Sequence, residues 1–411
     1  MNIRWAILLV VLALLVGFLF VVACGDDDDD SGDDDDDSGD DDDDDSGDDD
    51  DDSGDDDDDD SGDDDDDTDI SWKVETIDND SGYLASIDCD SQGAVHVAFY
   101  DSDYEGLMYA NNKTKTWQKE KVADLDLTSM DILYKPVIQL DTDGHVHIVY
   151  VSKVDTVPTL LRATNASGSW ATEAIKESGN IFQIDFALDS NDDYHITHGF
   201  LGTGVEYFTN KTGSWDVTLI SDIGHEHAIA IDKDNDVHIC YSEMIRLVYT
   251  NNKSGSWSDE TIREGDGQGF LRNTQGLSIA MDSYNKAHVS FYDTGEEIYE
   301  EGPYYSTNAS GTWESVDLDP EFISSTALAS SIAIDSDGFP HIVMRKSFYG
   351  IYATNKYGNW VVERMYDMEG NLMDGRFDMA LDSEDYIHMV YGYKAQEEPE
   401  RIYHIDYVTN K

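Results

Sequence analysis

The sequence predicts an all-β protein whose folded part is a seven-bladed β-propeller, with an N-terminal strand closing the last blade. Three observations support this fold class. A unit of apolar-x-apolar-Asp, a turn, His and a strand recurs seven times. It alternates with a second unit, Tyr-x-Thr/Asn-Asn, a turn, Trp and a strand. No stretch after residue 70 has helical periodicity, so each pair of units predicts a four-stranded antiparallel meander.

The first part of the chain, residues 1–23, has the composition of an export signal. Arg4 precedes the apolar run Ala6–Ala23, and Val21–Cys24 places a small residue directly before a cysteine. This arrangement resembles the bacterial lipoprotein cleavage box, which implies that residues 1–23 are a signal peptide and that Cys24 is lipidated. Because the run is also long enough to cross a bilayer, an uncleaved signal anchor is the alternative. Both alternatives place the remainder in the cell envelope, outside the cytoplasm, and Gly25 favours the outer membrane or cell surface.

Residues 24–67 follow the signal as a linker made of Cys24 and blocks of aspartate separated by Ser-Gly. The blocks hold 32 aspartates and no apolar residue. Such a segment cannot bury a core, so we expect a disordered, solvated stalk. We expect no cofactor. Because dense carboxylates attract divalent cations, a loose Ca²⁺ reservoir is the alternative interpretation of the blocks, although they define no coordination site.

The remaining residues, 68–411, are the predicted propeller and are themselves acidic. Removing the 32 aspartates and Arg4 from the formal net charge of −65 leaves −34 on this part. A domain with this charge is not a general binder of nucleic acid or of anionic membrane surfaces. We therefore expect membrane contact through the lipid anchor alone, and a monomer.

The first half of the repeat places an aspartate six positions before each histidine. The aspartates are Asp90, Asp141, Asp189, Asp232, Asp282, Asp335 and Asp382, and the histidines are His96, His147, His195, His238, His288, His341 and His388. Across a tight hairpin the two residues become neighbours that can hydrogen-bond. Because the pair is present in every blade, we interpret it as structural rather than as seven metal or acid–base sites. The Asp-x-Asp-Gly turns lack the distal glutamate of a calcium loop, and turn chemistry explains them.

The second half of the repeat predicts how the propeller closes. Its seven asparagines are Asn112, Asn165, Asn210, Asn252, Asn308, Asn355 and Asn410, but only six tryptophans follow them: Trp117, Trp170, Trp215, Trp257, Trp313 and Trp360. The seventh, Trp72, lies in the segment Ile70–Asp78, which matches the strands after the other tryptophans. We therefore expect this segment to complete the last blade. Cys89 and Cys240 each replace an apolar strand residue, and we expect no disulfide between them.

The repeat resembles the tandem propeller repeats of exported bacterial proteins, through the pattern "IAIDS…HI" followed by "ATNxSGSW". The resemblance covers nearly all of Ser71–Lys411 and implies architecture but no activity. The turn "TNxSGSW" is also similar to the Asp-box turn of sialidases. It differs from that turn by an Asn in place of the Asp and by a glycine one place closer to the tryptophan.

Functional residues are expected where the blades differ, on the face opposite the two tight turns of each blade. Residues at the start of the inner strands and on the variable loops are candidates for ligand binding: Lys135, Gln183, His225, Glu226, His227, Arg345 and Arg376. The histidines of "HEH" also make this stretch the densest candidate for a metal ligand set. Tyr299, Tyr304 and Tyr305 are expected to form a stacking surface for sugars or peptides.

Three function classes follow from these observations. A surface-anchored binding module for an extracellular glycan or protein is favoured, because the repeated chemistry is structural and the variable rim is polar. A glycan-active enzyme, such as a sialidase-like hydrolase or a lyase, is the alternative, although no catalytic residue can be assigned. A structural component of the envelope is the third. Converging arginines and paired carboxylates would favour the enzyme.

Overall fold

The computed structural model describes residues 70–127, 135–177, 183–200, 204–243, 245–264, 275–293, 302–319, 329–346, 349–365, 376–396 and 402–411. The segment Thr68–Lys411 forms one compact unit. The signal peptide, Cys24 and the aspartate linker lie outside the described residues. In the described part of the chain, no helix is long and apolar enough to cross a bilayer.

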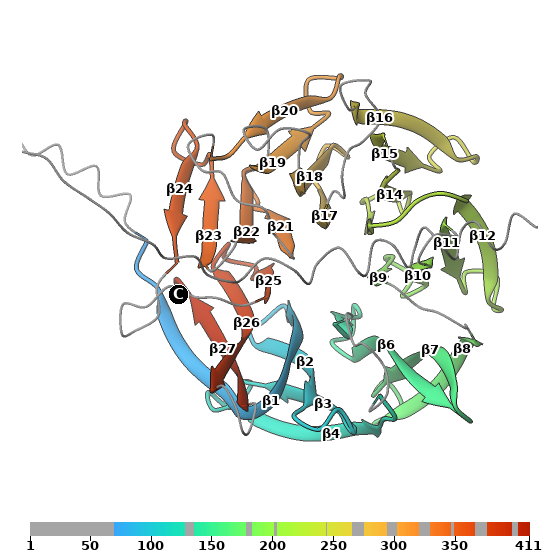
Figure 1. Cartoon of the computed structure of the whole chain (residues 1–411), viewed down its shortest axis with the longest axis vertical. Helices are drawn as coiled ribbons and strands as arrows, with labels where there is room; N and C mark the ends of the chain where they lie inside the picture. Colours follow the sequence, from blue (N-terminus) through green and yellow to red (C-terminus); the bar gives the residue numbers. More distant parts are fainter. Residues whose placement is uncertain are drawn as a thin grey trace, which may run out of the picture. The chain divides into compact units, whose positions relative to one another are not determined.

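Seven antiparallel four-stranded sheets form the blades of a β-propeller, which confirms the predicted fold class (Figure 1). The first blade consists of the second half of β1 (Lys73–Cys89), β2 (Val95–Asp101), β3 (Gly106–Asn111) and β4 (Gln118–Asp124). The second consists of β5 (Val137–Leu140), β6 (Val146–Val154), β7 (Val157–Thr164) and β8 (Ala171–Glu177). The third consists of β9 (Gln183–Leu188), β10 (Tyr194–Phe200), β11 (Gly204–Thr209) and β12 (Asp216–Ser221).

The remaining blades repeat the same meander. The fourth consists of β13 (His227–Ile231), β14 (Val237–Ser242), β15 (Arg246–Asn251) and β16 (Ser258–Glu264). The fifth consists of β17 (Gln275–Met281), β18 (Ala287–Asp293), β19 (Gly302–Thr307) and β20 (Glu314–Asp317). The sixth consists of β21 (Ser330–Ile334), β22 (Pro340–Lys346), β23 (Tyr349–Thr354) and β24 (Val361–Arg364). The seventh consists of β25 (Arg376–Leu381), β26 (Ile387–Gln396), β27 (Ile402–Thr409) and the first half of β1.

The long strand β1 closes the propeller, as the sequence predicts. Its first half pairs with β27, with Lys73 opposite Thr409, and its second half pairs with β2, with Cys89 opposite Val95. Figure 1 shows β1 in blue alongside β27 in red. The first and seventh blades therefore form one continuous seven-stranded sheet, and this pairing leaves β27 with no exposed edge.

The hydrophobic core lies between the faces of neighbouring blades. Between the first and second blades, Leu84 and Tyr100 pack in one buried cluster with Ile138 and Ile148. Both faces of each sheet are covered in this way, so strands such as β2 and β14 are buried almost throughout. Cys240 is part of such a cluster, and both Cys89 and Cys240 are free thiols.

Candidate functional site

A cavity of about 450 Å³ lies where the inner strands of the blades begin. This end of the strands is the one at which the variable connections between blades enter. Six equivalent positions, each six residues before a repeat aspartate, line the cavity: Leu84, Lys135, Gln183, Glu226, Gly276 and Ala329. The small residues of the fifth and sixth blades leave room, whereas the second to fourth blades contribute polar side chains.

Three residues further along the same inner strands, every blade has a large apolar residue. There the seven blades carry Ile87, Ile138, Phe186, Ile229, Ile279, Ile332 and Met379. These side chains pack between blades, so the symmetric core constrains them to be apolar. Lys135, Gln183 and Glu226, which lie at the start of these strands, are not constrained in this way. A nearly symmetric scaffold therefore carries an asymmetric set of side chains at one end of its channel.

An ion pair at the cavity links two blades that are not adjacent. Lys135 Nζ lies 2.7 Å from Asp378 Oδ1, although Lys135 belongs to the second blade and Asp378 to the seventh. The other oxygen of Asp378 accepts a hydrogen bond from the backbone N–H of Ile87 in the intervening first blade, at 3.2 Å. The carboxylate is thus fixed by the backbone of one blade and neutralised by the lysine of another.

Other polar side chains of the cavity form hydrogen bonds with backbone groups at the channel-side edges of the inner strands. Asp185 Oδ2 accepts from Ile229 N at 2.9 Å, so that the third blade caps the inner edge of the fourth. Gln183 binds His227 on both backbone groups, by accepting from its N–H at 3.2 Å and donating to its carbonyl at 2.9 Å. An inner strand has no further strand on its channel side, so these side chains supply the missing partners.

Burial changes the ionisation of two groups at the cavity. It raises the pKa of Asp185 from 3.8 to about 6, and the nearby Lys135 opposes part of this shift. Burial also lowers the pKa of His227 to about 3, which keeps its imidazole neutral near pH 7. The cavity therefore combines carboxylates in different environments with one ammonium group.

The sequence-predicted binding residues divide into three groups. Lys135, Gln183, Glu226 and His227 line the cavity together. Among the described residues, His225 and Arg345 are not part of this lining. For Arg376, the first residue of β25, the backbone is described but the side chain is not.

The histidines of "HEH" do not form a metal site with their surroundings. His227 is fully buried, and its ring packs against Gly199 of the neighbouring blade. Within the described part of the chain, no group of three or more His, Cys, Asp or Glu side chains is arranged to hold a metal ion. This stretch contributes Glu226 and the buried His227 to the lining of the cavity.

The expected tyrosine stacking surface is wrong for the two residues that can be placed. Tyr304 and Tyr305 of β19 are only 8% and 5% exposed. Tyr305 bonds to His288, and Tyr304 lies under the guanidinium of Arg263. Neighbouring blades cover both faces of the sheet at β19, so little of either side chain reaches solvent. Tyr299 lies outside the described residues.

The repeat aspartates and histidines meet in every blade, at N···O distances of 3.0–3.5 Å. In six blades the other ring nitrogen, Nδ1, lies 2.6–2.7 Å from a tyrosine hydroxyl of the same blade. Because a carboxylate only accepts, the Nε2–H of His96, His147, His341 and His388 donates to it, and Nδ1 accepts from the tyrosine. All seven histidines are buried, and each Nδ1 bonds to a tyrosine hydroxyl within the propeller. The Nε2 atoms of His195, His238 and His288 lie near the carboxylate without forming a hydrogen bond.

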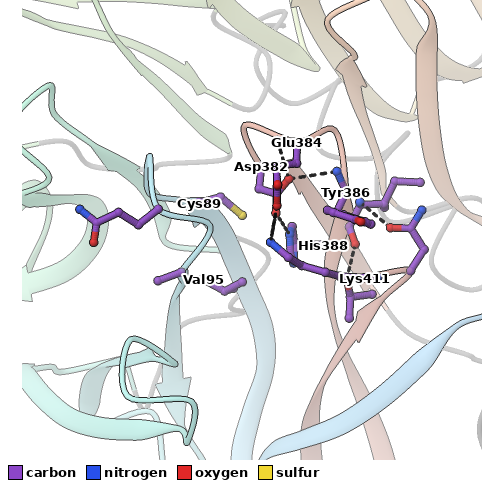
Figure 2. Close-up of polar contacts among 12 residues, drawn as sticks. Cys89, Val95, Asp382, Glu384, Tyr386, His388 and Lys411 are labelled. Atoms are coloured by element: carbon purple, nitrogen blue, oxygen red, sulfur yellow. Dashed lines mark hydrogen bonds and ion pairs between the residues drawn. The ribbon is translucent and has the colours of Figure 1, made fainter.

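Figure 2 shows this network in the seventh blade, where the carboxylate of Asp382 lies between His388 and Lys411, across from Cys89 of the first blade. The tyrosine that completes it is Tyr407. Sequence reasoning missed the tyrosine–histidine bond. The tyrosine recurs three residues before the repeat asparagine, and that spacing was the available signal.

The tryptophans join neighbouring blades. Trp170 packs edge-on against Tyr109 of the preceding blade, and Trp72 does the same against Tyr352. A smaller cavity of about 240 Å³ next to Trp170 lies on the tight-turn face. The Trp170 Nε1–H donates to Glu120 at 3.0 Å, a bond that Trp313 repeats with Glu260. This cavity thus belongs to the repeated structure, unlike the one at the channel.

Neither a known protein family nor a curated protein matches this sequence. Solved propellers share its fold. The polysaccharide lyase Uly1 is 9% identical, with a TM-score of 0.51 over 80% of this chain and 90% of that one. The α-L-arabinofuranosidase Arb93A from Fusarium graminearum is 10% identical, with a TM-score of 0.48 over 79% and 92%. A lectin of Aleuria aurantia, a six-bladed propeller, is 13% identical, with a TM-score of 0.45 over 69% and 94%. At such identities the likeness concerns the fold alone.

Proposed function

We propose that this chain is a lipid-anchored protein of the cell envelope whose propeller binds an extracellular glycan in the cavity at the channel. The anchoring part of the proposal rests on Val21–Cys24 and on the apolar run before it. The aspartate-rich linker would hold the propeller away from the membrane. Gly25, directly after the cysteine, supports the outer membrane or the cell surface as its location.

The asymmetry of the cavity carries the proposal of binding. A purely structural channel would repeat the same side chain in each blade, as the core positions do. Instead, equivalent positions carry Lys135, Gln183 and Glu226 in successive blades. Such variation on a rigid frame is typical of recognition surfaces built at the ends of strands.

The size and lining of the cavity favour a small polyhydroxylated ligand. Its volume of about 450 Å³ falls in the range of roughly 300–1,000 Å³ that is usual for small-molecule sites. Carboxylates and an amide provide hydrogen-bond partners for hydroxyl groups, and Leu84, Leu277 and Phe377 supply apolar surface. A whole protein partner needs about 800 Å² of surface on each side, far more than such a cavity offers.

A glycan array tests this proposal. The fragment Thr68–Lys411, which forms a compact unit, should bind a restricted set of glycans. The variant Glu226→Ala should bind the same set at least about tenfold more weakly, a loss of about 1.4 kcal/mol. The control Glu264→Ala changes an exposed glutamate at the end of β16 and should bind normally. Absence of any selective binding, or equal binding by Glu226→Ala, would contradict the proposal.

A glycan-active enzyme is the second candidate, favoured by one observation. Asp185 and Asp378 line the same cavity in different environments, because burial raises the pKa of Asp185 whereas Asp378 is paired with Lys135. Glycosidases use two carboxyl groups whose protonation states differ. Release of reducing ends from a bound glycan, abolished by Asp185→Asn, would establish this activity. Binding without turnover would leave the binding module as the function.

A further inference from the structure

Negatively charged side chains outnumber positively charged ones in the lining of the cavity. Among the described side chains that line it, Lys135 carries the positive charge, and Asp185, Glu226 and Asp378 are carboxylates. His227 contributes no charge near pH 7, because burial lowers its pKa to about 3. The surrounding domain adds a formal net charge of −34 over residues 68–411. A cationic ligand is therefore attracted to this end of the channel, and an anionic ligand is repelled.

The two side chains of the ion pair differ in burial and in the hydrogen bonds that fix them. The Asp378 side chain is only 13% exposed and is anchored by Ile87 N, whereas the Lys135 side chain is 35% exposed. Lys135 lies two residues before β5 begins, and its side chain crosses the first blade to reach Asp378. The ammonium group of a flexible, partly solvated lysine can return to water when another ammonium group takes its place at Asp378. The buried carboxylate, in contrast, stays in place.

Removing Lys135 without a replacement is costly for a different reason. It leaves the charge of Asp378 in a largely buried position with a single backbone hydrogen bond. Buried charges without a counter-charge are strongly destabilising. A ligand that brings its own ammonium group preserves the ion pair, whereas a neutral ligand does not.

We propose that the cavity recognises a sugar with a protonated primary amine, whose ammonium group takes the place of Lys135 Nζ at Asp378. This inference rests on the proposed glycan-binding function and specifies its ligand class. In the unliganded protein, the Lys135 ammonium group then occupies the position at Asp378 that the ammonium group of the ligand would take. The ring hydroxyls of the sugar face Gln183 and Glu226, on the polar side of the cavity.

Titration calorimetry on the full chain in detergent tests the inference with three probes: glucosamine oligomers, their N-acetylated counterparts, and glucose oligomers of the same length. The amine-bearing oligomers should bind at least about tenfold more tightly than the other two. The variant Lys135→Met removes the competing ammonium group and should tighten their binding by about threefold or more. Asp378→Asn keeps an acceptor for Ile87 N and should abolish the preference for the amine.

The control variant is Lys233→Met, which changes an exposed lysine of a tight turn and should leave all affinities unchanged. Weaker binding of the amine-bearing oligomers by Lys135→Met would overturn the inference, because it would make Lys135 a contact of the ligand. Equal binding of the neutral and amine-bearing oligomers would also overturn it. Should Asp378→Asn fail to fold, the direction of the Lys135→Met effect decides alone.

The same experiment separates this inference from the proposed function. If no oligomer binds and the protein also binds no glycan on the array, both the proposed glycan-binding function and this inference are wrong. If N-acetylated or neutral glycans bind and Glu226→Ala weakens them, the function stands and the ligand class is wrong. A lysine-containing peptide serves as a last probe, and its binding in preference to every sugar would overturn the sugar as the ligand.

Discussion

Tyr194 of β10 donates its hydroxyl hydrogen to Nδ1 of His147, a histidine of the neighbouring second blade. In the other six blades this nitrogen receives the hydroxyl of a tyrosine from its own blade. The second blade has Arg162 at the tyrosine position, and the Arg162 guanidinium lies 4.7 Å from the ring centre of Tyr194. The third blade therefore supplies a hydroxyl that the second blade lacks.

Loss of this hydroxyl should destabilise the propeller. We expect Tyr194→Phe to lower the free energy of unfolding by about 1–2 kcal/mol, because it leaves a buried acceptor without its donor. Introducing Arg162→Tyr into the same variant should recover part of the loss, since it restores the arrangement of the other blades. Urea unfolding of the natural, single and double variants measures both effects. An unchanged midpoint for Tyr194→Phe would show that the bond contributes nothing.

The repeat asparagines offer a matched pair of sites. Asn252 Oδ1 accepts from Val237 N at 2.8 Å, and five other blades repeat this bond between turn and strand. In the sixth blade the corresponding strand residue is Pro340, which has no N–H, and Asn355 Oδ1 has no hydrogen-bond partner among the described atoms.

Alanine at these two asparagines should therefore have unequal effects. Asn252→Ala leaves Val237 N without its partner and should cost about 1–2 kcal/mol of unfolding free energy. Asn355→Ala leaves no donor behind and should cost clearly less. Chemical denaturation of the two variants side by side makes the comparison. Equal losses would mean that the asparagines act through the turn backbone rather than through this hydrogen bond.

Two aspartates should respond to pH in opposite directions. The pKa of Asp185 is raised from 3.8 to about 6 by burial, so the folded state holds more protons than the unfolded state between these values, and stability falls as pH rises through this window. For Asp382, burial acts to raise the pKa, but hydrogen bonds from Lys411, His388 and turn N–H groups lower it to about 2. Its contribution is present above pH 3.8 and is lost as pH falls towards 2.

Asparagine variants separate the two effects. At pH 7.5, Asp185→Asn should be more stable than the natural protein by about 1–3 kcal/mol, and this gain should vanish near pH 4. Asp382→Asn should be less stable at neutral pH, with a deficit that shrinks below pH 4. Denaturation series from about pH 2 to pH 8 measure the differences. A gain for Asp185→Asn that does not depend on pH would contradict the role of its ionisation.

The closing strand gives a further prediction. Deleting Asp69–Ile77 removes the pairing with β27, the buried side chain of Ile77 and the packing of Trp72 on Tyr352. We expect the melting temperature to fall by roughly 5–10 °C. Deleting the linker segment 26–67 is the control and should leave the melting temperature unchanged. An unchanged melt after the first deletion would contradict closure by this strand.

The architecture was predictable because each blade repeats the same chemistry, and seven copies reinforce one interpretation. Even the closing role of Trp72 followed from counting tryptophans against asparagines. The lining of the candidate site was predictable only in part: Lys135, Gln183 and Glu226 were identified by their equivalent position on the inner strands, and His227 by the stretch "HEH". The contact of Lys135 with Asp378 was not, because two blades must be placed around the channel before these residues meet. The tyrosines of β19 were misassigned because burial of both blade faces is a tertiary effect.

The central claim is that ligand recognition resides at the channel cavity and not on the tight-turn face. Its most direct test is the affinity of the strongest array glycan for two variants, one on each face. Glu226→Ala changes the cavity, and Tyr284→Ala removes a side chain that is 80% exposed in a turn of the fifth blade. We predict at least about tenfold weaker binding for Glu226→Ala and natural affinity for Tyr284→Ala. Natural affinity for Glu226→Ala together with a loss for Tyr284→Ala would place recognition on the opposite face and contradict the claim.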